Sequence, residues 1–128
     1  MAQNIRLLIV DDEKMLRDLL LHHLDDYEGF EGVTAASSEE ALKLLETENI
    51  DVCIVDARLP GMNGEQFILE AWMRGACKRF ILHTGSLEMT LSERLMCIGM
   101  TEDDLFFKPV DYEAILDRIT QLFKEIKI

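Results

Sequence analysis

Cysteines, basic residues and long apolar runs are all scarce in this chain of 128 residues. Its three cysteines, Cys53, Cys77 and Cys97, have no close metal-ligand spacing. Because the cysteine count is odd and Met1–Arg6 lacks the features of a secretory signal, we expect free thiols in the reducing cytoplasm. No stretch approaches the roughly 18 uncharged apolar residues that a membrane-spanning helix needs, so we expect no membrane span.

The charge balance also excludes a class of partner. Lysine and arginine number 13 against 25 aspartates and glutamates, which gives a formal net charge of −12. A surface this acidic repels phosphate backbones and anionic lipids, so direct binding to nucleic acid or to a membrane is not expected. Hydrophobic residues make up 48% of the chain, which allows a proper core, and the length fits one domain over residues 1–128.

Short apolar runs alternate with helical patterns five times along the chain. The expected strands cover residues 5–10, 33–36, 51–55, 80–83 and 105–107, and the helical patterns fall between and after them, at about 14–25, after 37, around 67–72, at 87–98 and after 111. Nearly continuous apolar strands separated by helices predict a parallel sheet covered on both faces. We therefore predict an α/β fold, a flavodoxin-like, doubly wound (βα)5 sandwich with the strand order 2-1-3-4-5.

Several residues are expected to begin, end or orient these helices. Ser37 and Glu40 form a capping-box pair, Gly75 is a stop signal, and Trp72 has the spacing of a core residue. Asp111 can cap the last helix. The inner face of that helix is expected to carry Ile115, Ile119, Leu122 and Ile126.

Chemically matched residues stand at the carboxyl ends of four of the five strands. They are Asp11 and Asp12, Asp56, Thr84, and Lys108. In an open α/β sheet, ligands bind at this edge, and clustered carboxylate oxygens suit Mg²⁺. Each residue alone has a simpler explanation in turn chemistry, helix capping or solvated charge. Their coincidence on one edge favours a phosphoryl-transfer site, in which one carboxylate attacks while a metal ion and an ammonium neutralise the oxygens.

With the turn segment Leu59-Pro60-Gly61-Met62-Asn63-Gly64, this set resembles the CheY-like receiver domain of bacterial two-component response regulators. The resemblance spans about residues 5–126. It implies that Asp56 accepts a phosphoryl group from a histidine kinase or a phosphotransfer protein, in a reaction that depends on Mg²⁺. It also implies that Asp12 and Asp56 bind Mg²⁺ directly, together with the backbone carbonyl of Arg58, while Asp11 acts mainly through water.

The resemblance further implies that Thr84 and Lys108 contact phosphoryl oxygens, and that the Lys108–Pro109 peptide bond is cis. Phosphorylation would then change the surface formed by the fourth and fifth strands and helices. That surface would bind a downstream protein or an output domain absent from this chain, or form a dimer. Catalysis would be limited to phosphorylation of the domain itself and hydrolysis of its aspartyl phosphate, so we expect no enzyme in the ordinary sense.

Two other functions remain as alternatives. One is a pseudo-receiver, a protein-binding module that works without phosphorylation, although the intact set of site residues argues against it. The other is a small phosphatase with an aspartate nucleophile, but such enzymes generally need an acidic residue two positions after the nucleophile, where this chain has Arg58.

The sequence departs from the family pattern at three places. The switch position three residues before Lys108 is usually aromatic and is Leu105 here, so activation is expected to proceed without a rotating ring. The loop at residues 99–104 is longer than usual by roughly two residues, a change that loops tolerate easily. The Arg58 side chain either reaches the phosphoryl group, screens it from the attacking water, or points to solvent. His83, which ends the fourth apolar run, is expected to be a packed or loop-bonded imidazole.

Overall fold

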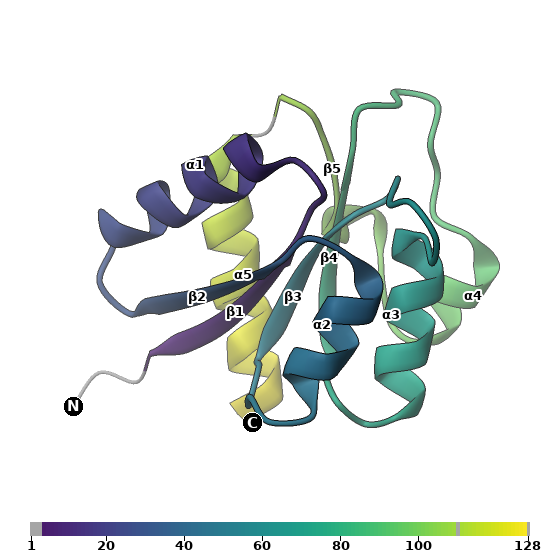
Figure 1. Ribbon diagram of the computed structural model, residues 1–128, viewed down its shortest axis with the longest axis horizontal. Helices are drawn as coiled ribbons and strands as arrows, with labels where there is room; N and C mark the ends of the chain where they lie inside the picture. Colours follow the sequence, from purple (N-terminus) through teal and green to yellow (C-terminus); the bar gives the residue numbers. More distant parts are fainter. Residues whose placement is uncertain (1–3, 110, 128) are drawn as a thin grey trace.

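The computed structural model describes residues 4–109 and 111–127. Its centre is a five-stranded parallel sheet with the order β2-β1-β3-β4-β5, which confirms the predicted doubly wound fold (Figure 1). The elements are β1 (Ile5–Val10), α1 (Lys14–Asp25), β2 (Phe30–Ala35), α2 (Ser38–Leu45), β3 (Val52–Asp56), α3 (Gly64–Met73), β4 (Arg79–Thr84), α4 (Glu93–Cys97), the 3₁₀ turn η1 (Glu102–Asp104), β5 (Leu105–Phe107) and α5 (Tyr112–Lys127).

Two hydrophobic cores lie on opposite faces of the sheet, because successive side chains of each strand alternate between the faces. Residues of α2, α3 and α4 cover one face and residues of α1 and α5 cover the other (Figure 1). Each fully buried leucine or isoleucine contributes roughly 1.5–3 kcal/mol. The first core includes Leu8, Val10, Val55, Phe67, Leu82 and Leu95, and the second includes Leu7, Ile9, Ile54, Ile81, Ile115 and Ile119.

Three expectations about these elements are wrong. The second strand begins at Phe30, three residues before the predicted start. The fourth helix begins only at Glu93, because the Ser92 side chain accepts the Leu95 N–H and caps it there, and Leu87 is 78% exposed. Trp72 is 41% exposed, since Phe67 and Ala71 share the inner face of α3 and residue 72 lies further around the helix.

The predicted helix caps are largely confirmed. Ser37 accepts the Glu40 N–H, but the Glu40 carboxylate accepts the N–H of Ala36 and not that of Ser37, so the predicted capping box is not closed. Asp111 accepts the N–H groups of two residues in the first turn of α5. Gly75 follows α3 with a φ of +67°, a conformation that favours glycine. The inner face of α5 buries Ile115, Ile119 and Leu122, and the side chain of Ile126 lies outside the described residues.

The loop at residues 99–104 folds into η1 and is tied to α5. Thr101 and Asp104 form a reciprocal cap, in which Asp104 Oδ2 accepts the Thr101 N–H at 2.9 Å. The other carboxylate oxygen of Asp104 accepts a hydrogen bond from Arg118 Nε at 2.7 Å. The long connection is therefore an ordered part of the structure beside β5.

Gly64 holds the loop after β3 close to the sheet. A Cβ atom at this position would collide with the backbone oxygen of Asp56 and with the Cα atom of Ala57. The Gly64 N–H also donates to the Ala57 oxygen at 3.2 Å. The absence of a side chain thus lets the first turn of α3 pack directly on the end of β3, where Asp56 stands.

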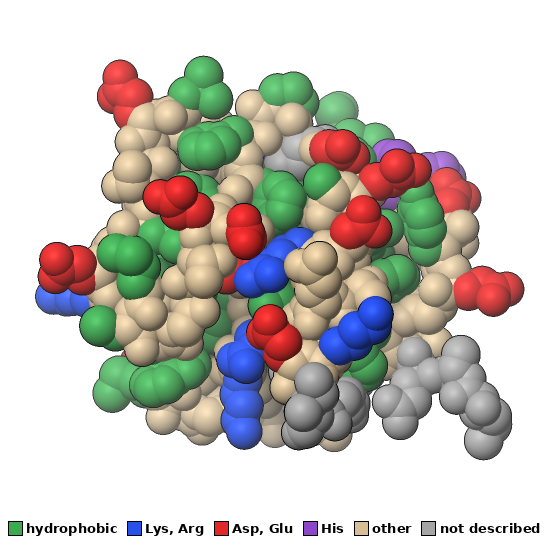
Figure 2. Space-filling view, turned by 180° about the vertical axis from the view of Figure 1, so that it is seen from behind, with side chains coloured by type: hydrophobic (Ala, Val, Ile, Leu, Met, Phe, Trp, Pro, Cys, Tyr) green, Lys and Arg blue, Asp and Glu red, His purple; other side chains and the backbone are tan. Residues whose placement is uncertain are grey.

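The surface agrees with the acidic composition. Acidic side chains are spread over the face seen in Figure 2, with a few basic ones near its middle. None of the helices in residues 4–109 and 111–127 combines the length and the apolar character that crossing a bilayer demands. The three cysteines are free thiols, and Cys53 and Cys77 are buried.

Candidate functional site

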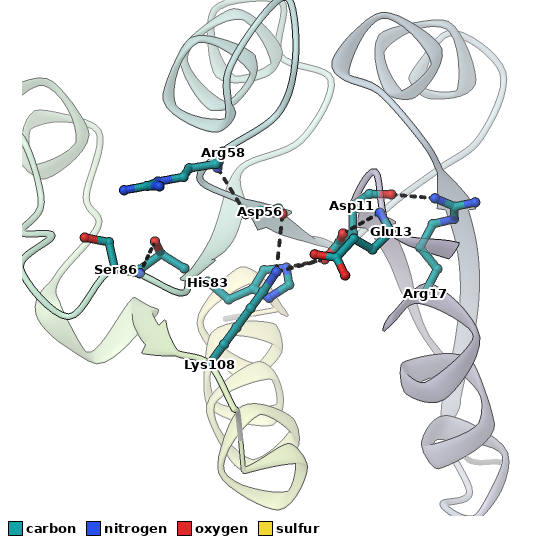
Figure 3. Close-up of polar contacts among 9 residues, drawn as sticks. Asp11, Glu13, Arg17, Asp56, Arg58, His83, Ser86 and Lys108 are labelled. Carbon is teal, nitrogen blue, oxygen red and sulfur yellow. Dashed lines mark hydrogen bonds and ion pairs between the residues drawn. The ribbon is translucent and has the colours of Figure 1, made fainter. Parts of the chain in front are cut away.

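The carboxyl ends of β1, β3, β4 and β5 bring the predicted residues to one edge of the sheet. Asp11 follows β1, Asp56 ends β3, and Lys108 follows β5. The Lys108 ammonium lies 3.4 Å from Asp11 Oδ2 and 3.3 Å from Asp56 Oδ2, so one cation contacts two carboxylates (Figure 3). The register supports this gathering, because Asp56 pairs with His83 and Thr84 pairs with Phe107 across adjacent strands.

Three carboxylates of this edge form a candidate cation site. One oxygen each of Asp11, Asp12 and Asp56 lies within 4.8 Å of the others. Asp11 and Asp56 are buried, whereas Asp12 is exposed and accessible from solvent. A compact set of carboxylate oxygens with an open side fits Mg²⁺, which binds oxygen ligands and keeps several waters. The donor set therefore matches the metal that the sequence suggests.

The turns around the site hold the two buried carboxylates in place. Asp11 Oδ1 accepts the Glu13 N–H at 2.8 Å, and the Asp11 backbone oxygen accepts Arg17 Nη1 at 2.7 Å (Figure 3). Asp56 Oδ1 accepts the N–H of Arg58 at 3.0 Å. Each carboxylate is thus oriented by the chain that follows it, and the backbone of Arg58 lies against Asp56, while the side chain of Arg58 is exposed and extends away from it (Figure 3).

Burial and charge act against each other in this site. Burial raises the pKa of Asp56, and the Arg58 N–H and the Lys108 ammonium only partly offset it. For Lys108, burial acts to lower the pKa, but the carboxylates of Asp11 and Asp56 outweigh it and the pKa is raised. Asp56 is therefore a carboxylate that depends on a nearby positive charge, and Lys108 stays an ammonium.

Thr84 lies at the same edge of the sheet, and its hydrogen bonds are to the backbone N–H groups of Ser86 and Lys108. It is fully buried, its hydroxyl oxygen accepts the Ser86 N–H at 3.1 Å, and its backbone oxygen accepts the Lys108 N–H at 2.7 Å. Thr84 therefore links the turn after β4 to the residue that supplies the ammonium. The Lys108–Pro109 peptide bond is cis, as the resemblance implies, and Leu105 is half-buried against the core on the α2–α4 side.

His83 is the site residue that sequence reasoning missed. Its Nε2 atom lies 3.6 Å from Asp11 Oδ2 and has no hydrogen-bond partner among the described residues, so the imidazole is packed but not loop-bonded. Burial and the Lys108 ammonium outweigh Asp11 and lower the pKa of His83 to about 4. The alternation of side chains along β4 could have found it, because this alternation turns residues 81 and 83 to the α1–α5 side, where the side chain of Asp11 also lies.

Comparisons with known proteins agree with this geometry. A family model for the response regulator receiver domain matches residues 7–120. The virulence sensor protein BvgS of Bordetella bronchiseptica is 36% identical over 125 residues, which cover 92% of this chain and 10% of BvgS. The alkaline phosphatase synthesis transcriptional regulatory protein PhoP of Bacillus subtilis is 26% identical over 125 residues, covering 98% of this chain and 51% of PhoP. The chain thus spans about half or less of the length of these curated relatives.

A solved structure shows the same fold over nearly the whole chain. The response regulator receiver protein from Pseudomonas putida superposes with a TM-score of 0.77 at 28% sequence identity, covering 94% of this chain and 99% of that one. The likeness therefore extends over nearly all of this chain and of the neighbour's chain.

Proposed function

Because the chain belongs to the response regulator receiver domain family, whose model matches residues 7–120, we propose that Asp56 accepts a phosphoryl group in a two-component phosphorelay. Receiver domains in general are phosphoacceptor switches. The observation that carries the proposal is the position of the Lys108 ammonium between the carboxylates of Asp11 and Asp56, beside the exposed carboxylate of Asp12. A fixed cation beside an acceptor carboxylate suits a group that must hold a phosphoryl dianion.

The phosphoryl donor in this proposal is a phosphohistidine of a histidine kinase or phosphotransfer protein. A carboxylate oxygen of Asp56 forms a bond to phosphorus while the phosphorus–nitrogen bond of the donor breaks, and the departing imidazole takes up a proton. Hydrolysis reverses the modification when water attacks phosphorus and the Asp56 carboxylate leaves, releasing inorganic phosphate. Lys108 stabilises the phosphoryl oxygens in both steps, because its ammonium already lies 3.3 Å from Asp56.

Asp12 and Asp56 are the residues that would hold Mg²⁺ directly, with the backbone carbonyl of Arg58, while Asp11 would act mainly through water. The ion would supply positive charge beside the phosphoryl oxygens. The chain itself contributes by holding the carboxylates of Asp11 and Asp56 in fixed orientations. The N–H groups of Glu13 and Arg58 hold Asp11 and Asp56 through one oxygen each and leave the other toward Lys108.

Thr84 is the proposed link between the phosphoryl group and the surface. Its hydroxyl oxygen accepts from Ser86, which leaves the hydroxyl proton free to donate to a phosphoryl oxygen. Such a bond would draw the turn after β4 toward Asp56 and change the surface formed by β4, α4, β5 and α5. A downstream protein, an output domain or a second copy of the chain would read that surface.

The proposed function also concerns where the protein acts and whether it turns over external substrates. We infer a cytoplasmic protein that phosphorylates and dephosphorylates only itself. The phosphatase alternative lacks support at the site, because the position two residues after Asp56 holds Arg58, whose side chain is exposed, and not a buried acid. The pseudo-receiver alternative predicts no labelling of Asp56 at all.

The test is labelling of the purified protein with acetyl phosphate and Mg²⁺, followed by mass spectrometry. We expect one phosphoryl group on Asp56 in the wild type and in Asp18→Asn, a control that changes an exposed carboxylate on α1. Asp56→Asn should remain unlabelled, and chelation of Mg²⁺ should slow labelling of the wild type strongly. Labelling of Asp56→Asn at the wild-type rate would defeat the assignment, and absence of labelling in the wild type would favour the pseudo-receiver.

A further inference from the structure

A cavity of about 450 Å³ lies between α1 and α5, on the side of the sheet opposite α2, α3 and α4. Its walls are mostly apolar and come from the strands and from both helices. The principal apolar residues are Ile9, Leu16, Leu20, Ile54 and Ile115. Leu19 also lines the cavity and is 44% exposed, so the cavity reaches the surface beside α1.

The size and lining of this cavity are those of a ligand site. Pockets for small molecules usually have volumes of about 300–1,000 Å³ and combine apolar walls with a few polar groups. A dry apolar cavity of about 150 Å³ already binds benzene in another protein. The cavity here is about three times as large, at about 450 Å³, which gives room for a molecule of two fused rings.

Three polar residues form one end of the cavity. Asp11, His83 and Lys108 line it, and His83 has only 5% of its surface exposed. The Nε2 atom of His83 is buried without a hydrogen-bond partner among the described residues, which is an uncommon state for a buried polar atom. The close-up in Figure 3 shows the imidazole beside the Lys108 ammonium and facing the Asp11 carboxylate.

The charges at this end select a neutral polar group. Asp11 repels an anion and Lys108 repels a cation, so a charged head group meets a like charge in either case. A hydroxyl group avoids both repulsions, because it can donate to the carboxylate and accept from the ammonium or the imidazole. Aromatic rings suit the remaining space, since His83 and Tyr112 add ring surfaces to its lining.

We propose that the cavity between α1 and α5 binds a small neutral aromatic alcohol of about two fused rings, with its hydroxyl at the end formed by Asp11, His83 and Lys108. The cavity adjoins the phosphoacceptor site and shares Asp11 and Lys108 with it, but neither Asp56 nor Asp12 lines the cavity. Binding is therefore tested without Mg²⁺ and without a phosphodonor. Failure of the phosphorylation test leaves this site standing, and the converse also holds.

The probes are 2-naphthol and naphthalene, which differ only in the hydroxyl group, and binding is followed by NMR titration of the ¹⁵N-labelled wild type. We expect 2-naphthol to shift amide signals of α1, β4 and α5 and to bind about tenfold more tightly than naphthalene, the factor for a hydrogen bond to charged groups. Equal affinities for the two probes, or shifts confined to other elements, would overturn the proposal without any variant.

Two substitutions locate the site, and one control matches them. Leu16→Phe places a ring in the cavity and is expected to weaken 2-naphthol binding about tenfold or more, whereas Leu69→Phe makes the same change on α3, outside the cavity, and is expected to leave binding unchanged. His83→Leu removes the polar nitrogens and is expected to bring the two affinities within about threefold. Wild-type affinity of Leu16→Phe for 2-naphthol would refute the assignment, and so would an undiminished preference in a folded His83→Leu variant.

Discussion

Asp104 fastens the loop before β5 to helix α5, and we expect its removal to be one of the more costly single changes in the chain. The residue is 2% exposed and uses both carboxylate oxygens, one for Arg118 Nε at 2.7 Å and one for the Thr101 N–H at 2.9 Å. The hydrogen bond with Asp104 also raises the pKa of Arg118, against the opposing effect of burial. The contact therefore differs from an ordinary surface ion pair.

The stability lost in Asp104→Ala follows from the two groups that lose their hydrogen-bond acceptor, the Thr101 N–H and the Arg118 guanidinium. A fully buried N–H left without a partner costs about 1–3 kcal/mol, and the Thr101 N–H costs less, because Thr101 is exposed and its bond to Asp104 is only partly buried. Breaking a fully buried ion pair costs about 3–5 kcal/mol, but the Arg118 side chain is 16% exposed and also donates to Gln121, so its share is smaller. We expect a total loss of about 3 kcal/mol in the free energy of unfolding, which lowers the melting temperature by roughly 10 °C for a domain of this size.

Urea denaturation of two further variants provides the comparison. Asp104→Asn keeps an acceptor for Thr101, and we expect about half of the loss. Glu70→Ala breaks the ion pair between Glu70 and Arg74, in which the two side chains are 40% and 48% exposed. We expect this variant to lose less than about 0.5 kcal/mol in the free energy of unfolding. If Asp104→Ala lost no more stability than Glu70→Ala, the loop would not be held by this contact and the reasoning would be wrong.

Three further predictions concern the site itself. Asp12→Asn, at an exposed position, is expected to change stability by less than about 0.5 kcal/mol without Mg²⁺ but to lose most of the Mg²⁺-induced rise in melting temperature, as thermal scans with and without chelator would show. Gly64→Ala forces a Cβ against the backbone of Asp56 and is expected to cost more than about 2 kcal/mol in urea titrations, against less than about 0.5 for Gly85→Ala, whose Cβ meets open space. Because burial lowers the pKa of His83 from 6.5 to about 4, the unfolded chain binds more protons in that interval, so the metal-free wild type loses stability as pH falls from 6.5 to 4. The His83→Leu variant should lose less stability over this pH range, because it has no imidazole to protonate. Equal changes in the free energy of unfolding with pH for the two proteins would contradict this prediction.

The strand ends could be predicted because local sequence defines them. Apolar runs that stop at Asp11, Asp56 and Lys108 need no tertiary information to be recognised, and parallel strands then gather their ends at one edge. The start of α4 could not be predicted in the same way. Leucines and isoleucine at positions 87, 91, 95 and 98 match a helix throughout, yet periodicity says nothing about where the backbone begins to turn, and Ser92 decides this by capping.

His83 and Trp72 show what a pattern of residue types leaves open. Alternation along the strands places His83 and Asp11 on the same face of the sheet. Their contact also depends on the register between the strands, which the apolar character of the runs does not reveal. Trp72 lies next to buried Ala71, and one step around a helix is enough to move a large ring from the core to the surface. Exposure at helix margins is decided by how the helix is rotated against the sheet.

The neighbours His83 and Thr84 give β4 an unusual position in the molecule. They are joined by a single peptide unit, yet alternation turns His83 toward the cavity under α1 and Thr84 toward the layer that contains α4. A small displacement of this strand end would move side chains on both faces of the sheet at the same time. The end of β4 therefore couples the two layers. Ligand binding in the cavity on the α1 side would displace Thr84, and a contact made by Thr84 on the α4 side would displace His83.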